Sequence, residues 1–258
     1  MTLLNVAEVT QALGGSLIGS RLLYHLTTTS TMDVAREAAA SDYPEGAVAL
    51  AEEQTAGRGR FQRQWVSPAG VNLYFSVLLY PDLHALQRLT MATSLGVARG
   101  ITRACGLSVA IKWPNDVRRG GRKLCGILLE SALEGERVRY AIVGVGVNVN
   151  LDPSPYPEIA ATATSLALEC GHPVSREQVL ASILLEMDGV YSVLRGGADL
   201  RPEWRSLLET LGKRVEVRWG DDREAGLAED VTEEGSLVLR RRDGSRITLP
   251  VGEVTLQV

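Results

Sequence analysis

Apolar and polar residues follow two different patterns along the chain, and the change falls near residue 212. Before it, apolar residues at helical spacing, or runs of strong helix formers, alternate with short apolar runs typical of buried strands. These patterns predict helices over residues 4–13, 30–41, 83–106, 175–197 and 199–212, and strands over residues 46–53, 70–80, 108–113, 123–133 and 137–150. The last two strands are predicted to form an antiparallel hairpin through residues 134–136.

From residue 213 on, short alternating strands are separated by turn residues. Segments of this kind cover residues 214–219, 220–224, 233–241, 242–249 and 252–258. A module of about 45 residues buries little core alone, so we expect it to pack on the larger part. The pattern therefore predicts an α+β domain over residues 1–211 and a small β domain over residues 212–258.

Composition and charge narrow the class of protein. The chain has 258 residues, of which 45% are hydrophobic and 22% charged, as in ordinary globular proteins. Its formal net charge of −4 argues against a general nucleic-acid-binding protein. No apolar run is long enough for a membrane span, and the first residues lack the features of a secretory signal.

The cysteines and histidines form no metal-binding pattern. Three widely spaced cysteines, Cys105, Cys125 and Cys170, indicate reduced thiols in a cytoplasmic protein, each most simply a small buried side chain. The histidines His25, His84 and His172 also lie far apart, and we interpret them as surface or structural residues.

A basic loop stands out in this mildly acidic chain. Residues 55–65, TAGRGRFQRQW, are called the flap below. Two glycines let the backbone approach a ligand, and three arginines supply forked donors for carboxylate or phosphate oxygens. The spacing is not that of a Walker A loop. The residues alone leave open a phosphate-binding loop or a mobile solvated one, and we expect the flap to be disordered without ligand because its arginines would have little to pack on.

Three further segments carry polar or glycine residues at strand positions. The segment KWPND, residues 112–116, ends a strand with a lysine, an amide and a carboxylate. In GRKLCG, residues 121–126, a lysine precedes a glycine within a strand, and in GVGVNVN, residues 144–150, two glycines and an asparagine share one strand face. Each has an ordinary structural explanation, but together they indicate one anion-binding cavity with a glycine floor.

These segments, in series, resemble the biotin–protein ligase family. STMD, EEQTAGRGRFQRQW, KWPND, GRKLCGILLE, GVGVNVN and GEVTL occur in this order from residue 30 to the end of the chain. The resemblance implies an α+β fold, with a central mixed or antiparallel sheet flanked by helices, and a small C-terminal SH3-like β-barrel. It also implies a two-step reaction with biotin, ATP and Mg²⁺. The biotin carboxylate attacks the α-phosphate to give biotinyl-5'-adenylate, and a lysine of a biotin carboxyl carrier domain then takes the biotin and releases AMP.

The resemblance implies functions for individual residues of the flap and of the binding pocket. Ser30, Thr31 and Gln54 should hydrogen-bond the ureido ring of biotin. Arg58, Gly59 and Arg60 should close over the carboxylate and the adenylate phosphate, Arg63 should meet ATP phosphates, and Trp65 should line the valerate tail or order the flap. The full set of implied binding residues is Ser30, Thr31, Gln54, Gly57, Arg58, Gly59, Arg60, Arg63, Trp65, Asn115, Lys123, Gly126, Gly144 and Asn148.

The implied catalytic residues are mostly cations. Lys123 should bridge the carboxylate and the α-phosphate, Lys112 should also bind phosphate, and Asp116 should orient or deprotonate the incoming lysine. Asn115 and Asn148 should meet the nucleotide, while Gly126 and Gly144 should form the floor. The implied catalytic set is Lys123, Arg58, Arg60, Lys112 and Asp116.

The chain departs from the family pattern at a few positions. Met32 replaces a common asparagine, and Gln257 stands where some members have an arginine. Fewer than thirty residues precede Ser30, so we expect a ligase without an N-terminal DNA-binding domain. The oligomeric state is left open between monomer and homodimer. Two alternatives are a lipoate or octanoate ligase or transferase of the same superfamily, and a non-catalytic sensor of biotin or an adenylate.

Overall fold

A seven-stranded mixed sheet forms the centre of the larger part of the molecule. The structure is a computed structural model that describes residues 3–219, 221–250 and 252–256. Only the pairing of the first two strands is parallel, and all the others are antiparallel. In spatial order the strands are β1 (Arg21–Thr28), β2 (Ala47–Gln54), β3 (Leu73–Leu79), β7 (Arg137–Val147), β6 (Arg122–Glu134), β5 (Asp116–Arg119) and β4 (Ala110–Lys112).

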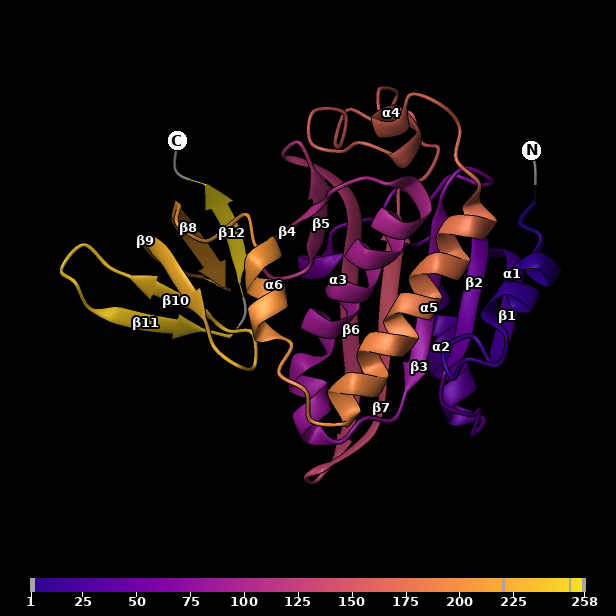
Figure 1. The fold of residues 1–258 in the computed structure, drawn as a ribbon, viewed down its shortest axis with the longest axis horizontal. Helices are drawn as coiled ribbons and strands as arrows, with labels where there is room; N and C mark the ends of the chain where they lie inside the picture. Colours follow the sequence, from indigo (N-terminus) through magenta and orange to yellow (C-terminus); the bar gives the residue numbers. More distant parts are fainter. Residues whose placement is uncertain (1–2, 220, 251, 257–258) are drawn as a thin grey trace.

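Helices cover both faces of this sheet, and the alternation along β2 shows why. Val48 and Leu50 belong to the main core under α3 (Leu83–Cys105) and α5 (Arg176–Arg195), whereas Ala47 and Ala49 face α2 (Thr31–Ala40). Small side chains on the α2 side let that helix lie close to the sheet. In Figure 1, α3 and α5 lie across the strands on one face. The predicted α+β architecture with a mixed, helix-flanked sheet is confirmed.

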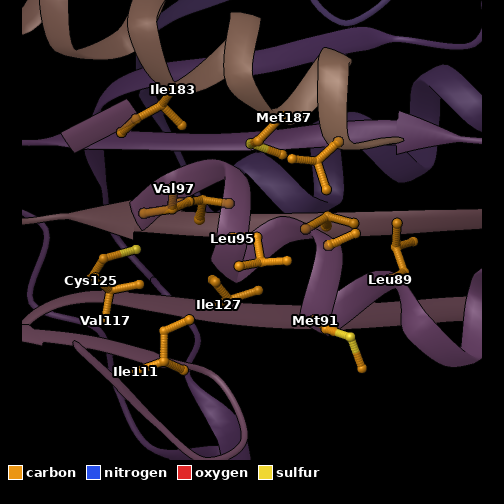
Figure 2. Packing of buried hydrophobic residues seen from close by; sticks show 14 of the residues in the cluster. Leu89, Met91, Leu95, Val97, Ile111, Val117, Cys125, Ile127, Ile183 and Met187 are labelled. Atoms are coloured by element: carbon orange, nitrogen blue, oxygen red, sulfur yellow. The ribbon is translucent and has the colours of Figure 1, made fainter. Parts of the chain in front are cut away.

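The two long helices α3 and α5 touch through glycine. A Cβ added at Gly100 would lie 2.5 Å from the Cα of Ile183, and one at Gly96 would lie 2.8 Å from the Cα of Met187. Figure 2 shows Ile183 and Met187 of α5 above the side chains of α3, with strand residues such as Ile127 beneath. The helices therefore approach more closely than larger residues would allow, and they form one layer over this face of the sheet.

Two strands and one α-helix of the larger part were not predicted, and neither was the 3-10 helix η1. The edge strand β1 has largely exposed or half-buried residues, so it lacks a strong apolar signal. Strand β5 is short, and it begins two residues after Pro114, where no strand was predicted. The third element is the five-residue helix α4 (Leu166–Cys170). Short helices also occur as α1 (Val6–Leu13), η1 (Arg60–Gln62) and α6 (Arg201–Leu207).

The C-terminal part is a five-stranded antiparallel sheet, as the alternating segments predicted. Its spatial order is β11 (Arg246–Leu249), β10 (Leu237–Arg240), β9 (Asp222–Val231), β8 (Arg214–Trp219) and β12 (Glu253–Leu256). Strand β9 is ten residues long, longer than the predicted segment 220–224. Trp113 joins the two sheets, because its buried indole Nε1 donates to the carbonyl of Gly235 at 2.8 Å. The domain boundary at residue 212 stays a prediction, and Gln257 lies outside the described residues.

Among the described residues, no helix has the length and apolar character that a transmembrane span needs.

Candidate active site

One large pocket of about 720 Å³ gathers nearly all the predicted site residues. It lies between the flap, the beginning of α2, the turn after β4, and the glycine-bearing strands β6 and β7. Of the predicted set, these residues line it: Ser30, Thr31, Gln54, Arg58, Gly59, Arg60, Arg63, Trp65, Lys112, Asn115, Asp116, Lys123, Gly126 and Gly144. Gly57 and Asn148 are not among the lining residues.

A chain of polar groups forms one end of the pocket, where α2 begins. Ser30 is the N-cap, and its hydroxyl accepts from the backbone N–H of Met32 at 3.3 Å. The backbone N–H of Thr31 donates to Oε1 of Gln54 at 2.9 Å, and Nε2 of Gln54 donates to the Ser67 hydroxyl at 3.0 Å. The amide of Gln54 is thus fixed in one orientation, with its carbonyl toward α2.

Ser76 completes this chain and was missed from the sequence. Its hydroxyl lies 2.8 Å from that of Thr31, and it is fully buried on β3. A serine inside the apolar run LYFSVLL is the signal that could have found it, because a buried hydroxyl needs a partner.

The glycines of β6 and β7 form a surface on which Trp65 lies. Gly126 and Gly146 face each other in register, and a Cβ on either would come within 2.8 Å of the Trp65 indole. A Cβ on Gly144 would instead lie 2.9 Å from Sδ of Met32. The apolar Met32 therefore fills the space above the next glycine along β7. Nε1 of Trp65 is buried and has no hydrogen-bond partner within the described part of the chain.

The two pocket lysines differ in their environment. Nζ of Lys123 lies 2.6 Å from Oδ1 of Asp116 and 5.2 Å from the centre of the Trp65 ring. Lys112 stands at the end of β4, where burial lowers its pKa although the charge of Asp116 opposes this shift. A lysine whose charge is poorly solvated gains most from an anionic ligand.

Arg60 is a half-buried arginine of the flap. It donates to the carbonyl of Gly252 at 3.0 Å and to Oδ1 of Asn115 at 3.2 Å. Burial lowers its pKa, with only partial compensation from the charges of Asp116 and Glu253. Asn115 is itself fixed, because its Nδ2 donates to the carbonyl of Ile127 at 2.6 Å. Arg60 and Lys112 thus bring positive charge into the pocket. Among the described residues, no carboxylate binds Arg60 directly.

The flap has many contacts, so the expectation that its arginines have little to pack on is wrong. Arg58 makes two hydrogen bonds to the carboxylate of Asp33, at 2.8 and 3.0 Å. Arg63 pairs with Glu253 of β12 at 2.6 Å. Although Asp33 lies three residues after the N-cap Ser30, its carboxylate binds arginine side chains instead of the terminus of α2.

Backbone contacts hold the flap as well. The N–H of Gly59 donates to the carbonyl of Arg63 at 2.8 Å, and the N–H of Trp65 donates to the carbonyl of Gly57 at 3.0 Å. Gly57 leaves no room for a side chain, since a Cβ there would lie 2.6 Å from the carbonyl oxygen of Trp65. At the tip, Phe61 and Gln62 have φ angles of 55° and 60°, a strained conformation for residues with large side chains. The predicted ligand contact of Gly57 stays a prediction.

Asn148 is placed behind the pocket. Its side chain is buried, donates to the carbonyl of Thr164 at 3.1 Å, and contacts Asn72 and the carbonyl of Lys123 at 3.4 Å each. In this position the amide supports the backbone of Lys123. Asn148 is not among the residues that line the pocket, and its predicted contact with the nucleotide stays a prediction.

The loop between β7 and α4 contributes a wall that sequence reasoning missed. Glu158, Ile159 and Thr162 line the pocket, and the carbonyl of Thr162 accepts from the backbone N–H of Lys123 at 2.8 Å. Nothing in the composition of this loop indicated a ligand. Its length alone was a weak signal, because long loops in compact domains are commonly functional.

The histidines lie as expected, whereas the expected burial of the cysteines holds only for Cys125, because Cys105 and Cys170 are half-buried. His25, His84 and His172 are exposed, the three cysteines are free, and the described residues contain no group of three or more His, Cys, Asp and Glu side chains suited to a metal. The pocket is therefore an anion site built from cations, a glycine floor and a polar end. Chemically, such a site can bring two anions together and hold a reactive intermediate away from water.

Comparison with known proteins points to one family. The model of the biotin/lipoate A/B protein ligase family matches residues 24–148, and that of the biotin protein ligase C-terminal domain matches residues 210–256. The chain is 35% identical over 246 residues to the bifunctional ligase/repressor BirA of Bacillus subtilis, covering 93% of this chain and 76% of that protein. It is 36% identical over 213 residues to the biotin–[acetyl-CoA-carboxylase] ligase of Paracoccus denitrificans, covering 80% and 88% of the two chains.

Solved structures agree with these relatives. The biotin protein ligase of Aquifex aeolicus in complex with biotin and ATP superposes with a TM-score of 0.78 at 27% identity. This likeness covers 92% of the present chain and 98% of that one. Both the large sheet and the C-terminal sheet therefore have counterparts in a ligand-bound relative.

Proposed function

This chain belongs to the biotin protein ligase family, and on that premise we propose that it joins biotin to a protein lysine at the expense of ATP. It is a biotin–[acetyl-CoA-carboxylase] ligase. The observation that carries the proposal for the site is the meeting of Arg60, Lys112 and Lys123 in one pocket above a glycine floor. Three cations lower the repulsion between two anionic substrates more than a single basic residue would.

In the first step the biotin carboxylate oxygen attacks the α-phosphorus of ATP, and pyrophosphate leaves. We assign Lys123 to the carboxylate and α-phosphate, and Lys112 and Arg60 to the phosphate oxygens, where negative charge accumulates in the transition state. The low solvation of Lys112 and Arg60 supports this, because burial makes their charges interact strongly with an anion. The predicted contact of Arg58 with substrate stays a prediction.

In the second step the amine of an acceptor lysine attacks the carbonyl of the mixed anhydride, and AMP leaves. The attacking nitrogen must lose a proton, and Asp116 is the lining carboxylate that we assign to accept or orient it. Its ion pair with Lys123 places it beside the reacting atoms. A biotin carboxyl carrier domain is the acceptor that we propose, because relatives are ligases of acetyl-CoA carboxylase.

The polar end of the pocket suits the ureido ring of biotin. Ser30, Thr31 and Gln54 offer both donors and acceptors there, and their mutual hydrogen bonds hold them in place. Next to them, Met32 on the Gly144 surface offers apolar contact where the family commonly has an amide. We propose that the thioether ring or the valerate tail packs on Met32, with Trp65 on the other side.

Magnesium and location complete the proposal. We propose that Mg²⁺ enters on the ATP phosphates, because this ion usually takes one or two carboxylates plus substrate oxygens and keeps several waters. Among the described residues, the carboxylates that line the pocket are those of Asp116, Glu158 and Glu253. We also propose a cytoplasmic location, which the free thiols support.

Pyrophosphate release tests the function. We expect the purified protein with MgATP to release pyrophosphate with biotin, and not with lipoate or octanoate. Lys123→Gln should lower the rate at least about a hundredfold, because it removes a charge at the reacting atoms. Lys213→Gln, at an exposed lysine of the small domain, is the matched control and should leave the rate unchanged. Release with lipoate alone would indicate a lipoate ligase, and release with no acid would favour a sensor.

A further inference from the structure

Arg58, the first arginine of the flap, lines the pocket, but its guanidinium group binds carboxylates of the protein. We propose that Asp33 and Glu130 are positioning residues that hold the flap closed by binding Arg58, so that this arginine anchors the flap instead of binding substrate. The proposal rests on the proposed function only for the identity of the intermediate that the flap retains.

The geometry of the contact is that of a bidentate ion pair. Nη1 and Nη2 of Arg58 lie 3.0 and 2.8 Å from the two carboxylate oxygens of Asp33. Nε of the same guanidinium faces Glu130 at 3.9 Å. All three nitrogens of Arg58 are thus directed at protein carboxylates, in the forked arrangement that makes arginine–carboxylate pairs specific.

A second arginine connects the two carboxylates and makes the group a network. Arg36, one turn further along α2, donates to Asp33 at 2.8 Å and to Glu130 at 2.5 Å. Two acids and two arginines from α2, β6 and the flap therefore neutralise one another. Networks hold geometry better than isolated surface pairs do. Arg58 also lowers the pKa of Asp33 to about 2, so the carboxylate stays charged in the physiological range.

The three flap arginines thereby divide into two kinds. Arg58 and Arg63 have carboxylate partners on α2 and β12, at the two sides of the flap. Arg60 lies between them in the sequence, and its hydrogen-bond partners in the described chain are only an amide and a backbone carbonyl. Substrate binding through Arg58 would require it to leave Asp33, whereas binding through Arg60 breaks no ion pair. The geometry thus favours Arg60 as the contact and Arg58 as the anchor.

The experiment measures how long the protein retains its adenylate. Asp33→Asn, Arg58→Gln and the double variant are loaded with labelled biotin and MgATP, and dissociation of the adenylate is followed after gel filtration. Glu37→Gln, an acid-to-amide change at an exposed position of the same helix, is the matched control. Glu130→Gln is the second route to the same loss, should Asp33→Asn fold poorly by circular dichroism.

We expect Asp33→Asn and Arg58→Gln each to speed dissociation about fivefold, the size expected of a networked, partly exposed pair. The double variant should be no faster than Arg58→Gln alone, because both changes break one contact. Glu37→Gln should match the unchanged protein. If Arg58 instead bound the adenylate directly, Arg58→Gln would act far more strongly than Asp33→Asn, and the two effects would multiply; that result would overturn the proposal.

A second readout does not depend on turnover. Trypsin cleaves after arginine, and the flap carries three such sites, so cleavage of the ligand-free protein reports how often the flap opens. Asp33→Asn and Arg58→Gln should accelerate cleavage after Arg60 and Arg63, the two flap sites that all the proteins share, and Glu37→Gln should not. Equal cleavage in all four proteins would contradict the anchor even if the chain proved to bind no biotin, while faster cleavage without adenylate formation would leave the anchor and remove the proposed function.

Discussion

At the scale of single residues, burial and pairing separate the cations of the pocket. Nζ of Lys123 lies 2.6 Å from a carboxylate oxygen of Asp116. Burial is instead the main influence on Lys112 and Arg60, and it lowers the pKa of both. A buried positive charge without a fully compensating negative charge nearby lowers the stability of the fold. An anion that binds beside it supplies the missing interaction. These residues thus contribute more to ligand affinity than to the stability of the free protein.

The lowered pKa of Lys112 gives a pH dependence with a defined sign. Its charged form is disfavoured in the folded state, so the ligand-free protein gains stability as pH rises from that lowered pKa toward 10.5. Adenylation needs the charged form, so kcat/KM should begin to fall at a pH below 10.5. Lys112→Arg keeps the charge and should move this fall to higher pH. A pH profile that is identical for the two proteins would show that another group governs it.

Sequence reasoning worked best for residues whose type alone indicates their chemistry. The arginines, lysines and glycines of the pocket were predicted because charge and the lack of a side chain are properties of the residue itself. Ser76 and Asn148 were missed or placed differently because their contacts come from distant segments. Asn148, for example, meets Asn72 and Thr164, and no local pattern in GVGVNVN indicates either partner.

At the scale of elements, the packing of α3 on α5 depends on two glycines that sequence patterns treat as defects. Helix propensity disfavours glycine, and the spacing of apolar residues indicated only that both helices are amphipathic. Gly96 and Gly100 instead remove side chains where the backbone of α5 passes. The prediction of both helices was confirmed. Their close approach could not be predicted, because the sequence of one helix does not show which part of the other helix packs against it.

Alanine at two glycines of these helices should have opposite effects. Gly100→Ala places a methyl group 2.5 Å from the Cα of Ile183, where backbone must move, and should lower the free energy of unfolding by about 1–3 kcal/mol. Gly189 lies on the exposed side of α5 with no atom within 4 Å of an added Cβ. Gly189→Ala should therefore raise the free energy of unfolding by about 1 kcal/mol. Urea unfolding followed by circular dichroism measures both, and a stabilised Gly100→Ala would contradict the close packing.

Strand β1 and the order of the flap were not predicted, because each depends on where the fold places the element. Among the described residues, strand β1 pairs only with β2 at the edge of the sheet, and its side chains are exposed or half-buried, so few of them need to be apolar. The flap was expected to lack partners because Asp33, Glu130 and Glu253 are far away in the sequence. Its order comes from ion pairs across three elements, which the fold creates.

At the scale of the whole molecule, the two sheets are joined at the active site. Trp113 lies between the pocket residues Lys112 and Asn115 and is almost fully buried, with 1% of its surface exposed. Its backbone N–H donates to the hydroxyl of Thr210 at 3.0 Å, and its indole reaches the small sheet at Gly235. Arg60 and Arg63 of the flap also contact Gly252 and Glu253. The small sheet therefore supports the turn that carries Lys112 and Asn115.

Removing the indole hydrogen bond should weaken both parts together. Trp113→Phe leaves the carbonyl of Gly235 without its donor and should lower the free energy of unfolding by about 1–3 kcal/mol. We expect KM for ATP to rise as well, because the lysine turn loses its support. Trp219→Phe, at a half-buried tryptophan of β8, is the control and should change neither quantity strongly. Loss of stability with an unchanged KM would mean that the small sheet does not position the pocket.

The glycine surface under Trp65 also has an optical consequence. Of the four tryptophans in the chain, Trp65 is the one that lines the pocket among the described residues, while Trp113 and Trp204 are buried elsewhere. Its indole lies against Gly126 and Gly146, beside the ammonium group of Lys123, with an unpaired ring N–H. Indole emission depends on nearby charge and polarity, so a ligand that changes either is recorded in the intrinsic fluorescence of the unlabelled protein. The glycines that make room for Trp65 thus place a built-in optical probe of substrate arrival inside the pocket.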